Sequence, residues 1–178
     1  RTGLSDNHPD IIGPIMPYLN KYNRLAIISE NSDYPAGVKQ ALKDQLSSTT
    51  EIVADETFNS GEKDFRTYLT KIKAKNPEAL FINVGTSAST PALIVKQARE
   101  LGISAALLGN YLLVGSDSLK MAGDLLEGAI AYDLPSLDSS NPKAVSFMEK
   151  YRARYGEPYS SWDAGGRYDT VFITVNAL

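Results

Sequence analysis

The stretch that decides the fold is residues 24–58, RLAIISENSDYPAGVKQALKDQLSSTTEIVADETF. It begins with a compact apolar run, Arg24–Ser29, which is typical of a buried parallel strand. After it, Pro35 suits the start of a helix, and the apolar residues that come next have helical spacing. The stretch ends in a second strand, Glu51–Phe58. It therefore predicts a strand, a helix and a second strand in succession.

The same alternation continues along the chain. We predict five strands, at Arg24–Ser29, Glu51–Phe58, Ala79–Val84, Ser104–Leu108 and Gly128–Tyr132. We predict helices from Pro35, over Glu62–Asn76, over Pro91–Leu101 with Gly102 as its cap, over Ser116–Ala122, over Lys143–Tyr155, and from Trp162 or Asp163. Alternating strands and helices indicate right-handed crossovers between parallel strands. The fold class is therefore α/β, a three-layer, mostly parallel, flavodoxin-like sheet.

Composition excludes several classes of function. A chain of 178 residues suits one domain, and its net charge of -3 argues against a nucleic-acid partner. There is no cysteine, which removes thiol nucleophiles and zinc-thiolate sites, and the single His8 makes a histidine-based triad or metal site difficult. Glycine-rich phosphate and dinucleotide motifs and the Gly-x-Ser-x-Gly elbow are absent from the sequence. We therefore expect no catalytic residue, no metal and no cofactor.

The remaining possibility is a binding site at the carboxyl ends of the strands. In doubly wound sheets, ligands bind there, where the winding direction reverses. The residues at those positions are Tyr34, Thr86 with Ser87, and Asn110 with Tyr111. Each also has an alternative to ligand contact. Tyr34 could be a surface aromatic residue, and Asn110 and Tyr111 could serve in packing.

Loop residues 85–90 carry four hydroxyl groups directly before a helix. Free backbone N–H groups and hydroxyls at a helix start favour a carboxylate or similar anion, although a plain helix cap is an alternative. Glu30 and Asp33 also come after the first strand, and we expect both to be solvated loop acids.

Several short stretches together resemble a known family. They are Arg24–Ile28 followed by Tyr34, Gly61–Phe65, Lys96–Gly102, Glu127–Gly128, Phe147–Gly156 and Tyr168–Asp169. In order and spacing they resemble the periplasmic solute-binding proteins of the branched-chain amino acid (Leu/Ile/Val) type, the partners of ABC transporters. The resemblance covers nearly the whole chain.

The resemblance implies a two-lobed protein that closes on its ligand like a hinge. Residues 1–23 would be the hinge strand and the segment leading into a lobe, and residues 24–178 the second, C-terminal lobe, ending in a helix over Tyr168–Leu178. The chain starts without Met and stops inside an apparent helix, so we expect a fragment whose N-terminal lobe is missing. The implied partners are that lobe, a small-molecule ligand and an ABC permease. The implied location is the periplasm, or the cell envelope as a lipoprotein, after a precursor with a signal peptide.

Site residues are carried over from the family position by position. Tyr34 matches a tyrosine that contacts ligand, and Thr86, with Ser87 beside it, falls where another contact residue, often aromatic, is found. Asn110 or Tyr111 falls where amino acid binders have an acid that holds the ligand ammonium. That acid is absent, and a buried ammonium without a counter-charge is costly. Aromatic acids, amides and other small polar solutes are therefore open as ligands. Substitution of the missing acid by Glu30 or Asp33 is a less favoured alternative.

Three functions are compatible with these observations, in order of preference. The first is a non-enzymatic solute receptor that delivers a small molecule to a permease. The second is a ligand-sensing domain of a receptor or regulator with the same fold, because fold alone does not fix function. The third is a flavodoxin-like enzyme, for which the sequence offers no catalytic group.

Overall fold

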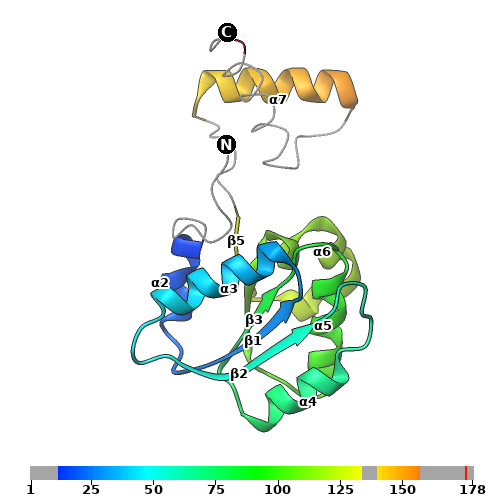
Figure 1. Cartoon of the computed structure of the whole chain (residues 1–178). Coiled ribbons are helices and arrows are strands. Elements are labelled where there is room, and N and C mark those ends of the chain that lie inside the picture. Colours follow the sequence, from blue (N-terminus) through cyan, green and yellow to red (C-terminus); the bar gives the residue numbers. More distant parts are fainter. Residues whose placement is uncertain (1–11, 134–139, 157–174, 176–178) are drawn as a thin grey trace. The chain divides into compact units, whose positions relative to one another are not determined.

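A parallel five-stranded sheet organises the first part of the molecule (Figure 1). The structure is a computed structural model, and it describes residues 12–133, 140–156 and 175. The chain divides into two units, Gly3–Tyr132 and a second one made of Arg1–Thr2 and Asp133–Leu178. The sheet lies in the first unit.

The strands are arranged in the order β2-β1-β3-β4-β5, and every neighbouring pair is parallel. Their bounds are β1 Arg24–Glu30, β2 Glu51–Phe58, β3 Ala79–Asn83, β4 Ala106–Asn110 and β5 Ile130–Tyr132. The chain moves outward from β1 to β2, and then returns past β1 to build β3, β4 and β5 on the other side. The winding direction therefore reverses between β1 and β3, as the fold class predicts.

Helices cover both faces of this sheet. Figure 1 shows α2 (Met16–Leu19) and α3 (Asp33–Gln45) on one face, and α4 (Arg66–Ala74), α5 (Thr90–Glu100) and α6 (Ser116–Ala122) on the other. Short 3-10 turns complete the unit: η1 Gly13–Ile15, η2 Tyr111–Val114 and η3 Gly123–Leu126.

The inner strand β1 is buried on both faces, which explains its unbroken apolar sequence. Ala26 and Ile28 belong to the core that α4 and α5 close, and side chains alternate along a strand, so Leu25 and Ile27 face α3. The edge strand β2 is only partly buried.

All five predicted strands and the helix over Ser116–Ala122 are confirmed, with some boundaries moved. The fourth strand was predicted over Ser104–Leu108 and runs instead over Ala106–Asn110. Its pairing with β3 starts only at Ala106, opposite Ala79, and β4 continues to pair with β5 at Asn110.

The helix predicted from Glu62 begins at Arg66. Two hydrogen bonds explain the later start. The Glu62 carboxylate accepts from the Asn59 N–H at 3.3 Å, which closes a turn, and the Phe65 N–H donates to Gln97 Oε1 of α5 at 2.6 Å.

The second unit contains α7, Pro142–Tyr155, which confirms the helix predicted over Lys143–Tyr155. Asn141 caps its start by accepting from the Lys143 N–H at 3.0 Å, and Gly156 ends it in the left-handed conformation. The helices predicted from Trp162 and over Tyr168–Leu178 lie outside the described residues except for Val175, and the hinge strand at Arg1–Thr2 lies wholly outside them. Among the helices that the structure describes, none is both long and apolar enough to cross a bilayer.

Gly109 of β4 is the position where the sheet tolerates no side chain. A Cβ there would lie 2.6 Å from the carbonyl oxygen of Ile82 and 3.2 Å from Leu113 Cδ2. We expect Gly109→Ala to lower the free energy of unfolding by about 1–3 kcal/mol, because the backbone of β3 has to move. Urea denaturation of the chain measures the change.

Gly13→Ala is the matched control, because an added Cβ at Gly13 meets nothing within 4 Å. That variant should unfold at the midpoint of the original chain or slightly above it. Equal midpoints for the two variants would contradict the close approach of β3 and β4 at Gly109.

Candidate ligand-binding site

The predicted site residues come together at the carboxyl edge of the sheet. Tyr34 lies in the first turn of α3, Thr86 and Ser87 lie in the loop after β3, and Tyr111 begins η2 after β4. Since β1, β3 and β4 are parallel neighbours, their carboxyl ends lie along one edge. This is the common edge that the sequence predicts, next to the reversal of winding between β1 and β3.

Three tyrosines gather at this edge. The hydroxyls of Tyr34 and Tyr132 lie 3.2 Å apart, and Tyr132 at the end of β5 is only 3% exposed. Burial raises the pKa of the Tyr132 hydroxyl well above its ordinary value, and the nearby Tyr34 and Tyr111 raise it further. The Tyr132 hydroxyl therefore stays protonated at neutral pH, and the three tyrosines together bring aromatic rings and hydroxyls to this edge.

Asn110 is completely buried, and both ends of its amide are used within the protein. Its Nδ2 donates to the Val84 carbonyl at 2.6 Å, and its Oδ1 accepts from the Leu112 N–H at 3.2 Å. Asn110 therefore fastens the end of β4 to the end of β3 and starts η2. The adjacent Tyr111 is only half-buried, so Tyr111 has surface at this edge.

Asn83 has a similar role one strand away. Its Nδ2 donates to Ser29 Oγ at 3.0 Å and to the Pro35 carbonyl at 2.7 Å. It thereby fastens the end of β3 to the end of β1 and to the start of α3. Sequence reasoning missed Asn83 and Tyr132, although two signals were present: Asn83 is a polar residue near the end of the apolar strand predicted over Ala79–Val84, and Tyr132 closes the strand predicted over Gly128–Tyr132.

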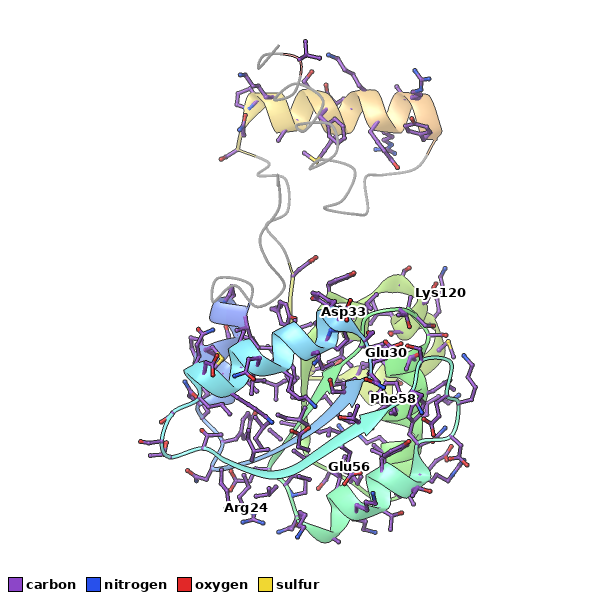
Figure 2. All side chains as sticks on the ribbon, in the orientation of Figure 1. Arg24, Glu30, Asp33, Glu56, Phe58 and Lys120 are labelled. Carbon is purple, nitrogen blue, oxygen red and sulfur yellow. The ribbon has the colours of Figure 1, made fainter. Side chains whose placement is uncertain are left out.

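Glu30 ends β1, and Figure 2 labels it at the opposite end of that strand from Arg24. One carboxylate oxygen accepts from the backbone N–H groups of Gly85 at 2.7 Å and Thr86 at 3.0 Å. The other accepts from Ser60 Oγ at 2.6 Å and from Thr86 Oγ1. Burial alone would raise the pKa of the Glu30 carboxyl, but these hydrogen bonds outweigh burial and hold its pKa below the ordinary value.

These contacts correct one expectation. Glu30 is not a solvated loop acid, since it is 3% exposed, whereas Asp33 is exposed as expected. The Gly85 and Thr86 N–H groups, in the loop where the sequence favours an anion, donate to the Glu30 carboxylate. The alternative of a plain helix cap is not seen, because Ser89, at the cap position of α5, makes no side-chain capping bond.

The rest of that loop leaves Ser87 half-buried, with its hydroxyl 3.1 Å from the Ser89 hydroxyl. Thr86 is exposed although its Oγ1 is bonded to Glu30. Within the described ranges, no group of three or more His, Cys, Asp or Glu side chains lies close enough to hold a metal ion. The edge thus presents the half-buried rings of Tyr34 and Tyr111 and the hydroxyl of Ser87.

The Tyr34–Tyr132 pair can be tested by a double-mutant cycle. Tyr34→Phe, Tyr132→Phe and the double variant remove the two hydroxyls without changing the rings. We expect a coupling free energy of about 0.5–1.5 kcal/mol, the usual contribution of one hydrogen bond, in urea denaturation. The cycle isolates the pair from the other contacts of either side chain, and strictly additive effects would show that the two hydroxyls do not interact.

Comparison with known proteins gives the fold and the site a family. The sequence model of the family described as periplasmic binding protein matches residues 8–178. The chain is 24% identical over 157 residues to the leucine-, isoleucine-, valine-, threonine- and alanine-binding protein of Pseudomonas aeruginosa, covering 88% of this chain and 41% of that protein.

Solved structures agree. The branched-chain amino acid transporter substrate-binding protein LivJ of Streptococcus pneumoniae, in complex with isoleucine, superposes with a TM-score of 0.76 at 29% identity, over 98% of this chain and 50% of LivJ. The leucine-binding protein LivK of Thermotoga maritima superposes with a TM-score of 0.81 at 25% identity, over 99% and 51%. The chain thus spans about half the length of these proteins or less, and it belongs to the periplasmic binding protein family.

Proposed function

We propose that this chain is the second, C-terminal lobe of an ABC-transporter substrate-binding protein, which captures a small solute between two lobes. The observation that carries the proposal is the group of half-buried Tyr34, Ser87 and Tyr111 at one sheet edge, in a chain of this family. The proposal includes no chemical step. Its partners are the N-terminal lobe and an ABC permease, and its location is the periplasm, or the cell envelope as a lipoprotein.

Each site residue has a part in this proposal. Tyr34 and Tyr111 supply aromatic surface and hydroxyls, which suit one polar and one apolar end of a small molecule. Ser87 and the exposed Thr86 supply polar contacts from the loop after β3. Asn110 holds the backbone on either side of Tyr111 in place, through its hydrogen bonds to Val84 and Leu112.

The solute is proposed to be amino-acid-like or an aromatic or other organic acid. The named relatives point to amino acids, since their names give leucine, isoleucine, valine, threonine and alanine. The buried Asn110 and its neighbour Tyr111 offer no carboxylate for a ligand ammonium, which favours solutes without one.

A binding screen on the two-lobed protein that contains this chain tests the proposal. Thermal shift over a panel of amino acids, amides and aromatic acids, followed by calorimetry, should identify one class bound with a Kd of roughly micromolar. In that protein, Tyr34→Ala and Tyr111→Ala should each weaken binding about tenfold or more, because each removes a contact surface.

Tyr18→Ala is the matched control. Tyr18 is an exposed tyrosine of α2, the helix that precedes the amino end of β1, whereas the proposed site lies at the carboxyl end. It should leave the Kd unchanged. The isolated 178-residue chain should bind the same solute at millimolar concentrations or more weakly, roughly a thousandfold loss, because closure supplies contacts from both lobes. Turnover of the bound solute, or undiminished binding by both tyrosine variants, would contradict the proposal.

A further inference from the structure

Glu30 is distinguished by its burial and its charge. Among the residues that the structure describes, the buried polar side chains are Ser29, Glu30, Thr50, Asn83, Thr90, Gln97, Asn110 and Ser118. Glu30 is the single ionisable member of that set. Burial of a carboxylate is costly unless hydrogen bonds replace its lost hydration. The four donors around Glu30 supply these hydrogen bonds, and their arrangement indicates what Glu30 does at this place.

The donors match the full capacity of a carboxylate. A carboxylate offers about four lone-pair sites, two on each oxygen. Oε2 accepts from the N–H groups of Gly85 and Thr86, and Oε1 accepts from the hydroxyls of Ser60 and Thr86. No acceptor site is left over for the ammonium of a solute.

The position of this carboxylate is that of a bound anion. Successive backbone N–H groups that point at one spot form an anion-binding concavity. Here the Gly85 and Thr86 N–H groups lie in the loop after β3, at the reversal of winding where such sheets bind ligands. The side chain of Glu30 fills that spot from β1.

Packing closes the same place. A Cβ added to Gly85 would lie 2.9 Å from Pro35 Cδ and 3.3 Å from Ser32 Oγ. The loop after β3 therefore presses directly against the residues that come after β1. A solute group does not enter between β1 and β3 without moving one of these loops.

We propose that Glu30 is a built-in anion, which fills the reversal point between β1 and β3 and fixes the loop that carries Thr86 and Ser87. Glu30 is thus a positioning and specificity residue, and only its effect on the solute rests on the proposed function. An anionic group of the solute cannot bind the Gly85 and Thr86 N–H groups, because Glu30 already accepts from them. A cationic group of the solute has no free acceptor on Glu30. The solute group that meets Tyr34, Ser87 and Tyr111 is therefore uncharged.

Removal of the Glu30 side chain should expose a receptor for small carboxylates. In the 178-residue chain, Glu30→Ala should lower the melting temperature by roughly 5–10 °C, because several charge-assisted hydrogen bonds are lost. Sodium formate, the smallest carboxylate, should recover about half of that loss or more, with a saturating dependence on concentration. Formamide, which is neutral and of similar shape, should recover none.

A spectroscopic readout separates binding from general stabilisation. In Glu30→Ala, formate should shift the amide signals of Gly85 and Thr86 in nitrogen-15 NMR spectra with the same saturation. In the unchanged chain those two signals should stay fixed, because Glu30 occupies the place. If Glu30→Ala does not fold alone, refolding it from urea in formate should yield folded protein, and refolding in formamide should not.

Asp55→Ala is the matched control. The Asp55 carboxylate is bonded within the protein too, by two cations, Lys39 Nζ at 3.1 Å and Lys43 Nζ at 2.7 Å, but unlike Glu30 it lies on the exposed side of β2. Formate should not rescue this variant. An equal formate response in Glu30→Ala and Asp55→Ala, or equal amide shifts in Glu30→Ala and the unchanged chain, would overturn the proposal.

If Glu30→Ala fails to refold in formate as well as in formamide, that result would also overturn the proposal. None of these measurements needs the natural solute. If formate rescues Glu30→Ala but the screen finds no bound solute, the proposed function is wrong and the role of Glu30 stands. If the screen finds a solute but formate does not rescue Glu30→Ala, the role of Glu30 is wrong and the proposed function stands.

Discussion

The carboxyl edge of the sheet depends on one buried charge, the carboxylate of Glu30. It joins three segments that are distant in sequence: the end of β1, the turn after β2 through Ser60, and the loop after β3 through Gly85 and Thr86. The hydrogen bonds offset the cost of burial and favour the charged form. The geometry of the loop that carries Ser87 therefore depends on an acid whose two oxygens are both bonded within the protein.

Two buried asparagines and a serine extend the same construction across the sheet. Asn83 ties β3 to β1, and Asn110 ties β4 to β3. Ser118 of α6 donates to the carbonyls of Ala88 at 3.0 Å and Leu112 at 2.7 Å, which ties α6 to the loops after β3 and β4. These bonds make the edge rigid, and a rigid surface is the kind that binds a small molecule with little reorganisation.

Most of the fold was predictable from the sequence, because hydrophobic periodicity reports which segments are buried. The apolar run Arg24–Ser29 and the alternation of strands and helices were sufficient for the sheet and its topology. The start of α4 was not predictable in the same way. It depends on Gln97, 32 residues further along the chain, taking the N–H of Phe65.

The site shows the same division. Topology predicted the shared edge of Tyr34, Ser87 and Tyr111, but not the partner of Tyr34, which is Tyr132, 98 residues away. In the sequence Glu30 resembled an ordinary loop acid, because its charge is visible there and its hydrogen-bond partners are not. Three of its four hydrogen bonds are made to residues at least 55 positions away. Long-range polar contacts need coordinates, whereas burial periodicity does not.

The ionisation of Glu30 in the intact chain tests this account most directly. Carbon-13 NMR of its side-chain carboxyl during an acid titration gives the pKa, and the Gly85 and Thr86 amide signals report the same event. We expect a pKa below the ordinary value of a glutamate, about 4.3, with both amides shifting together at that pH. A pKa at or above the ordinary value, or amides that do not respond, would contradict it.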